Sequence, residues 1–264
     1  MLPTFTVLNF DVITFPFVIF FALVSCIIVY ILSPNYKRYF QIIVFKICLS
    51  TLLFAAIGAR FFSAITLLAS SNESFWYNII YGGSVFYGGV IGGIAGLLLV
   101  CRHKHYEFFV FTDLFATILP LGHAIGRLGC YLNGCCYGKT YNRIFAINYI
   151  VDGIQTMVFP TWFFEAFFCG VLFLYFQFIH RNNATGNRTA IYLLSYSIYR
   201  FLIEFMRGDK IRGFLGLFSS SQIISVFALI CGFIILLISY KDSHENYLFT
   251  KEKKHADQSI SKAI

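Results

Sequence analysis

One stretch of the chain, from Pro120 to Gly138, reads PLGHAIGRLGCYLNGCCYG. It lies in a very apolar sequence, yet it contains a histidine, an arginine, an asparagine, three cysteines and several glycines. A charged side chain in a hydrocarbon layer costs several kcal/mol unless it is paired or faces a polar cavity. Arg127, in the middle of the stretch, is therefore the first candidate for a functional residue.

The composition around this stretch is that of a polytopic membrane protein. Of the 264 residues, 58% are hydrophobic and 12% are charged, against about 25% charged residues in an average globular chain. The first apolar run, residues 10–32, follows no basic segment and precedes no small-residue cleavage site. We therefore expect it to be a retained helix rather than a signal peptide, and we expect an all-α fold.

A membrane-spanning helix needs about 20 mostly apolar residues. The sequence predicts seven transmembrane helices, approximately at residues 10–32, 40–62, 83–100, 108–131, 161–179, 190–206 and 216–240. Lysines and arginines are more numerous in the C-terminal tail and in the loops after the first, third and fifth helices than on the opposite side. Because positive residues favour the cytoplasmic side, we expect the N-terminus outside and the C-terminus in the cytoplasm.

This pattern divides the chain into a seven-helix transmembrane domain, residues 1–240, and a charged cytoplasmic tail, residues 241–264. The formal net charge is +8, but the basic residues are spread over short loops. Anionic membrane lipids are therefore the expected partners, and nucleic acid is not.

Eight cysteines are present, and most of them lie singly in apolar segments, where they are expected to act as small packing residues. Cys130, Cys135 and Cys136 cluster. Together with the nearby His123 they do not reproduce a recognised zinc spacing. The sequence therefore predicts no metal site and no cofactor.

The central stretch suits the binding of an anionic, oxygen-rich group. His123 and Arg127 are four residues apart and share one face of a helix. The planar fork of an arginine matches phosphate, and Asn133 adds a neutral donor and acceptor. The alternative for Arg127 is a structural ion pair, for which Asp113 and Glu165 are available carboxylates.

The sixth predicted helix carries a second charged group. Arg200, Glu204 and Arg207 are spaced to line one helical face. Such charges must face a cavity or each other in a membrane, and Glu204 is expected to neutralise and orient the arginines. Arg60 and Arg127 both lie toward the outer ends of their helices, so these side chains are expected to converge on one cavity in the outer leaflet.

A glycine-rich run, GGSVFYGGVIGGIAG, extends from Gly82 to Gly96. The four-residue spacing of its later glycines predicts close helix packing. Its earlier part, up to Gly88 and Gly89, is expected to present backbone to a substrate. Tyr87 either offers a hydroxyl to the site or is an interfacial aromatic residue.

In their order along the chain these motifs resemble those of the prolipoprotein diacylglyceryl transferases. The core motif is GRLGCYLNG from Gly126 to Gly134. The flanking motifs are GAR at 58–60, GGSVFYGG at 82–89, Asp113, PTWFFE at 160–165, YRFLIEFMR at 199–207 and SQIIS at 221–225. The resemblance covers most of the chain and implies the same seven-helix plan.

The resemblance implies a reaction. Enzymes of this family transfer a diacylglyceryl group from phosphatidylglycerol to the lipobox cysteine thiol of a preprolipoprotein at the outer face of the bacterial cytoplasmic (inner) membrane, and glycerol 1-phosphate is released. The family's essential arginines correspond to Arg127 and Arg200, with Arg207 in support and Glu204 as the carboxylate of its sixth helix.

The reaction needs a thiolate, and the chain departs from the family where a base is expected. The family's histidine in the first glycine motif is replaced by Tyr87, and a tyrosine, with a reference pKa of about 10, is a poor base. His123 is the alternative. Cys130 and Cys135 also replace usual family residues, an asparagine and an acid.

Two other functions stay open from sequence: a related membrane enzyme that uses an anionic phospholipid with another acceptor, and a non-catalytic lipid-binding or transport protein. The chain has no internal repeat of the kind that many transporters show. The expected catalytic residues are Arg127, Arg200, His123 and Tyr87, and the expected substrate contacts come from Arg127, Arg60, Asn133, Glu204, Arg207, Gly88 and Gly89.

Overall fold

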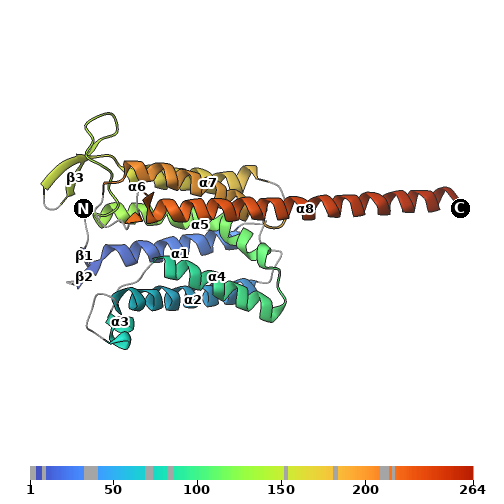
Figure 1. Cartoon of the computed structure of the whole chain (residues 1–264), viewed down its shortest axis with the longest axis horizontal. Helices are drawn as coiled ribbons and strands as arrows, with labels where there is room; N and C mark the ends of the chain where they lie inside the picture. The colour runs from blue at the N-terminus through green and yellow to red at the C-terminus, as the bar shows by residue number, and fades with distance from the viewer. Residues whose placement is uncertain are drawn as a thin grey trace. The chain divides into compact units, whose positions relative to one another are not determined.

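The structure is a computed structural model that describes residues 4–7, 10–32, 41–68, 74–81, 86–151, 154–180, 184–208, 214–215 and 218–263. The chain forms two compact units. The larger unit comprises Met1–Leu32 and Thr112–Ile264, and the smaller comprises Ser33–Phe111. Figure 1 shows the elements of both in chain order by colour.

The fold is almost entirely helical, as the sequence predicts. The helices are α1 (Thr14–Leu32), α2 (Gln41–Leu68), α3 (Phe75–Tyr81), α4 (Phe86–Lys104), α5 (Phe108–Leu132), α6 (Thr161–Leu174) with its π-helical extension η2 (Tyr175–Ile179), α7 (Asn187–Ile203), the 3₁₀ turn η3 (Glu204–Met206) and α8 (Ser220–Ala263).

The chain is a polytopic membrane protein. Within the described residues, 4 helices are long and apolar enough to cross a membrane: Ile42–Leu68, Phe108–Leu132, Thr161–Ile179 and Ser220–Lys241. A shorter apolar helix covers Pro16–Leu32, and α4 and α7 occupy the two remaining predicted segments. Large apolar side chains are exposed along these helices, for example Phe20, Ile57 and Phe227, as expected of surfaces that face lipid.

Three short antiparallel hairpins accompany the helices in the described residues, and no sequence pattern predicted them. They pair β1 (Thr4–Val7) with β2 (Phe10–Ile13), β3 (Ile147–Val151) with β4 (Ile154–Val158), and β5 (Phe214–Leu215) with β6 (Phe218–Ser219). The first predicted helix is therefore shorter than expected, because residues 10–13 form a strand and the helix begins at Thr14.

Glycines bring α2 and α4 together in the smaller unit. A Cβ at Gly92 would lie 3.0 Å from Gly58 Cα, and a Cβ at Gly96 would lie 2.5 Å from Phe54 Cβ. No side chain fits at such distances, so the two backbones pack as closely as glycine permits. The packing role predicted for the later glycines is confirmed.

In the larger unit, α7 and α8 each begin with a strong cap. Asp113 of α5 accepts hydrogen bonds at the start of α7, with Oδ2 2.8 Å from Gly186 N and Oδ1 2.8 Å from Thr189 N. At the start of α8, Gln222 N donates to Ser219 Oγ and Ser219 N donates to Gln222 Oε1. This reciprocal pair is a capping box. It stabilises the N-terminus of α8, and Figure 1 shows that α8 continues far beyond α7, the helix against which it packs.

The end of α7 differs from the continuous helix that the sequence predicts. The α-helix stops at Ile203, Glu204 begins the 3₁₀ turn, and Arg207 is extended with φ −74° and ψ 141°. Arg207 instead forms a β-bridge with Gly138. It therefore does not lie on one helical face with Arg200 and Glu204.

Candidate active site

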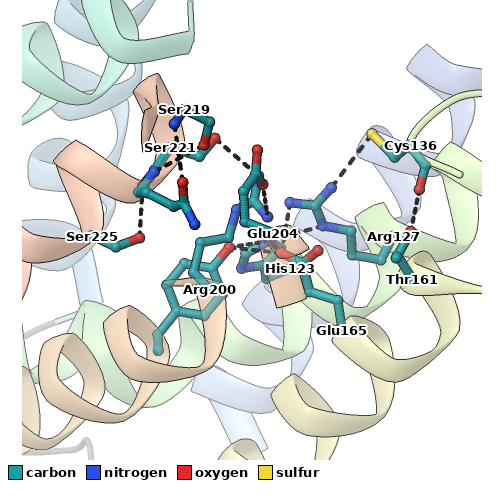
Figure 2. A network of polar contacts seen from close by, with 12 residues as sticks. His123, Arg127, Cys136, Thr161, Glu165, Arg200, Glu204, Ser219, Ser221 and Ser225 are labelled. Atoms are coloured by element: carbon teal, nitrogen blue, oxygen red, sulfur yellow. Dashed lines mark hydrogen bonds and ion pairs between the residues drawn. The ribbon is translucent and has the colours of Figure 1, made fainter. Parts of the chain in front are cut away.

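The centre of the candidate site is the carboxylate of Glu165 in the first turns of α6. Its Oε1 atom lies 2.7 Å from Arg127 Nη2 of α5, and the Glu165 side chain is 2% exposed. Tyr196 of α7 donates a hydrogen bond to the same oxygen at 2.8 Å. One oxygen atom thus joins side chains of three helices, as Figure 2 shows for Arg127 and Glu165.

His123 lies beside this ion pair, one helical turn before Arg127. Arg127 Nε donates to His123 Nε2 at 3.3 Å, and the Tyr196 hydroxyl lies 3.4 Å from the same nitrogen. The two rings of His123 and Tyr196 pack with centroids 4.9 Å apart. The same nitrogen also lies 3.5 Å from Glu165 Oε1, so one edge of the ring faces the guanidinium, the carboxylate and the phenol together.

Arg200 forms a second arginine–carboxylate pair. Its Nη1 atom lies 2.8 Å from Glu204 Oε2, and its Nη2 donates to Ser221 Oγ of α8 at 3.0 Å. Arg200 and Glu204 are both buried. The capping box at Ser219 and Gln222 positions Ser221, so the start of α8 helps to orient the guanidinium (Figure 2).

The loop after α5 connects the two arginine groups. Arg127 Nη1 donates to Cys136 Sγ at 3.6 Å. Two residues further on, Gly138 N bonds to Phe159 O, and Lys139 N bonds to Met206 O. This loop is thereby tied both to the segment that leads into α6 and to the end of α7, where Arg207 is buried.

Cys136 lies in the loop after α5, outside the membrane-spanning helices, and its thiol contacts Arg127. Its pKa lies below the ordinary value, first because of hydrogen bonding with the neighbouring thiols of Cys130 and Cys135, and also because of the positive charges of Arg127 and Arg207. Burial opposes this shift. The sulfur of Cys136 therefore lies next to the arginine in the centre of the site, and the positive charge of that arginine favours its ionised form.

Of the expected site residues, His123, Arg127, Arg200, Glu204 and Arg207 all belong to the larger unit. Asn133 also belongs to it, but lies exposed in the turn after α5. The remaining four, Arg60, Tyr87, Gly88 and Gly89, belong to the smaller unit.

Within the smaller unit, Arg60 is exposed and its Nη1 donates to Ile80 O at 3.1 Å. Gly88 and Gly89 both face α2: a Cβ at Gly88 would lie 2.6 Å from Phe62 Cβ, and one at Gly89 would lie 3.5 Å from Ala59 Cβ. Tyr87 lies in the first turn of α4. Gly82 to Val85 and the Tyr87 side chain lie outside the described residues.

The sequence patterns indicated no site roles for Glu165, Tyr196, Thr161 or Ser221. Glu165 was one of two carboxylates open to Arg127, and the structure selects it, since Asp113 is occupied by the cap of α7. The only available signal was the acidic residue in PTWFFE. Tyr196 and Ser221 carried none, because a hydroxyl in a membrane helix is common and its partner depends on helix packing.

The fold and the site define a polytopic membrane protein with two arginine–carboxylate pairs at the ends of its helices. The family model described as prolipoprotein diacylglyceryl transferase matches residues 3–238. The chain belongs to this family, and it is accordingly an enzyme of the family.

Similar proteins agree with this placement. The chain is 28% identical over 232 residues to phosphatidylglycerol–prolipoprotein diacylglyceryl transferase 2 of Clostridium perfringens, covering 86% of this chain and 90% of that protein. It is 34% identical over 191 residues to the phosphatidylglycerol–prolipoprotein diacylglyceryl transferase of Finegoldia magna, covering 71% and 74%. A Campylobacter hominis protein of the same name is 30% identical over 217 residues, covering 75% of each chain.

Proposed function

We propose that the chain transfers the diacylglyceryl group of phosphatidylglycerol to the lipobox cysteine thiol of preprolipoproteins, the first step of bacterial lipoprotein maturation. Family membership and the names of the relatives support this activity. The observation in the structure that carries it is the contact set of Arg127, which holds the guanidinium between Glu165, His123 and Cys136.

The chemistry requires one bond to form and one to break. The acceptor thiolate attacks the phosphate-bearing carbon of the diacylglyceryl group, and a C–S bond forms. The C–O bond between that carbon and the phosphate breaks, and glycerol phosphate leaves with the electron pair of this bond. Negative charge develops on the leaving group, and a fixed guanidinium stabilises such charge best where water is excluded. Each Nη atom of Arg127 carries two N–H groups. Nη2 contacts Glu165, and Nη1 contacts Cys136. A second N–H on each remains for phosphate oxygens.

Arg200 is proposed as the second phosphate-binding residue and Arg207 as a supporting charge. Glu204 keeps Arg200 oriented through the 2.8 Å ion pair. The proposed substrate contacts also include Asn133, Arg60, Gly88 and Gly89. For these four the support is the family resemblance of their motifs.

The acceptor thiol must lose its proton, and His123 is the proposed base. Its Nε2 lone pair already accepts a hydrogen bond from Arg127, so a substrate thiol must displace that contact to be deprotonated there. Tyr87 at the family's histidine position is the competing candidate.

The proposed topology has seven transmembrane helices, the N-terminus outside, the C-terminal tail from residue 241 in the cytoplasm, and the active site toward the outer leaflet of the bacterial inner membrane. The distribution of lysines and arginines supports it. A reporter that fluoresces only in the cytoplasm, fused after Ile264, should be bright. A dark but stable fusion would contradict the orientation.

The activity is tested with the purified chain, labelled phosphatidylglycerol and a lipobox peptide. We expect the peptide to gain the mass of one diacylglyceryl group, with glycerol phosphate released in equal amount. Arg127→Ala and Arg200→Ala should abolish the transfer while Arg102→Ala, on the exposed end of α4, should retain it. A folded parent protein that modifies no lipobox peptide but binds the phospholipid would instead favour a lipid-binding role.

A further inference from the structure

The thiols of Cys130, Cys135 and Cys136 form a cluster that has no chemical step in the proposed reaction, although Cys136 contacts Arg127. Their three Sγ atoms all lie within 4.8 Å of one another, and none of the three is in a disulfide. In the part of the chain that the structure describes, this is the one group of three metal-ligating side chains found so close together. All three side chains are half-buried.

Contacts from three elements hold this cluster in place. Cys135 N bonds to Cys130 O at 3.0 Å, which continues the last turn of α5. Thr161 at the start of α6 donates to Cys136 O at 2.5 Å, and Tyr149 of β3 donates to Cys135 O at 3.5 Å. Cys136 itself adopts the left-handed region with φ 59°, which is uncommon for a residue with a side chain. The fold thus fixes the backbone that carries the three sulfurs.

The spacing of the sulfur atoms suits a shared ion. Three thiolates at about 2.3 Å from a tetrahedral ion lie roughly 3.8 Å apart, so small side-chain rotations bring the cluster to that geometry. A disulfide would use only two of the sulfurs. One possible pair, Cys135 and Cys136, is adjacent in sequence, and the Cα spacing of about 3.8 Å across a trans peptide is shorter than ordinary disulfides require.

The charge around the cluster also suits an ion bound by thiolates. Three thiolates and one divalent cation carry a net negative charge. Arg127 Nη1 lies 3.6 Å from Cys136 Sγ and offsets this charge as a hydrogen-bond donor to the sulfur. A guanidinium has no acceptor and does not compete as a ligand; outer donors of this kind orient the ligands of metal sites.

We propose that Cys130, Cys135 and Cys136 bind one thiophilic divalent ion, Zn²⁺ or its analogue Cd²⁺, through three thiolates, with one coordination position left for a non-protein ligand. Soft thiolate ligands select ions of this class, and three protein ligands with an open fourth position are an established arrangement for zinc. The metal site goes beyond the proposed function. Binding of the metal ion is measured without lipid or peptide, so a negative result for the metal site leaves the proposed transfer reaction untouched, and the reverse also holds.

The test uses the full chain, purified with a histidine-free affinity tag in detergent, reduced and stripped of metal. Cd²⁺ is titrated and followed by its thiolate charge-transfer absorption, and Zn²⁺ is titrated against a chromophoric chelator. We expect one ion per chain. Cys130→Ser, Cys135→Ser and Cys136→Ser should each weaken binding by about tenfold or more. Cys231→Ser, a half-buried cysteine of α8, should not change it.

A second measurement covers the case in which a serine variant fails to fold. Zn²⁺ should protect all three thiols of the parent protein from maleimide, as mapped by mass spectrometry, and should leave the labelling of Cys231 unchanged. The proposal is overturned if the reduced parent takes up no ion saturably, or if uptake persists when all three cysteines are replaced in a folded protein.

Discussion

The Oε1 atom of Glu165 lies 2.7 Å from Nη2 of Arg127, and the carboxylate is 2% exposed. The two residues come from different helices, α6 and α5, so the contact depends on how these helices pack. It neutralises the arginine and also fixes the plane of its guanidinium, because Nε and Nη1 have partners of their own in His123 and Cys136. The ion pair therefore orients the donors that we assign to the phosphate.

Glu165→Gln should lower both stability and activity. The glutamine retains an oxygen that accepts from Tyr196, but Arg127 is left without its counter-charge. Breaking a buried ion pair costs about 3 kcal/mol or more, so the melting temperature in detergent should fall and the transfer rate should drop at least about tenfold. Glu107→Gln, in the exposed turn before α5, is the control. Unchanged melting and transfer for Glu165→Gln would exclude a role for the carboxylate.

Arg127→Lys should remove the transfer activity although the charge is kept. Lysine carries one compact charge and cannot serve Glu165, His123 and Cys136 at once with a planar fork. Loss of a donor that stabilises developing negative charge typically costs about 100-fold to 1,000-fold in rate. The measurement is single-turnover transfer to a lipobox peptide, with Arg102→Lys as the matched control. Parent-like rates for Arg127→Lys would show that only net charge matters at this position.

His123→Ala and Tyr87→Phe should rank the two candidate bases. A general base typically contributes about 100-fold or more. His123→Ala should therefore slow single-turnover transfer by about that factor, and Tyr87→Phe should slow it less. Both variants should keep the parent's melting temperature within a few degrees, so that the rates can be compared. If Tyr87→Phe is the slower of the two, the base role returns to the glycine motif.

Gly138→Ala should destabilise the protein by disturbing the packing of the loop after α5 against the end of α7. A Cβ there would lie 2.8 Å from Phe159 Cβ and 2.9 Å from Met206 O, and overpacking of this kind costs about 1–3 kcal/mol. Gly126→Ala is the control, since a Cβ at that position would meet nothing within 4 Å. Thermal unfolding should show a lower melting temperature for Gly138→Ala and an unchanged one for Gly126→Ala. Equal melting temperatures would contradict the close packing at Gly138.

Much of the fold is predictable because a segment that crosses a membrane must make all its backbone hydrogen bonds internally, as a helix does. Such a helix also needs a long run of apolar side chains, which is visible in the sequence. The helices α2, α5, α6 and α8 all follow predicted segments. The hairpins were not predictable in the same way. Each strand has only two to five residues, too few to establish an alternating pattern within an aromatic sequence.

For the candidate site, spacing within one helix was the useful signal. His123 and Arg127 are in contact, and so are Arg200 and Glu204, as their four-residue spacing predicts. Spacing was wrong for Arg207, because α7 ends before it and the backbone becomes extended. A sequence pattern can place residues on a face of a helix, but it does not say where the tertiary contacts end that helix.

Composition, apolar runs and motif order were enough to identify a polytopic, helical membrane protein of the diacylglyceryl transferase family. They also singled out Arg127 and Arg200 as charged residues in membrane helices. The pairing of carboxylates with arginines depends on the packing of the helices: Glu165 contacts Arg127, while Asp113 caps α7. The tertiary structure also brought the three thiols of the Pro120 to Gly138 stretch to within 4.8 Å of one another. The physical reason is that an ion pair or a thiol cluster depends on the directions of side chains from separate elements, which helix packing and loop contacts set.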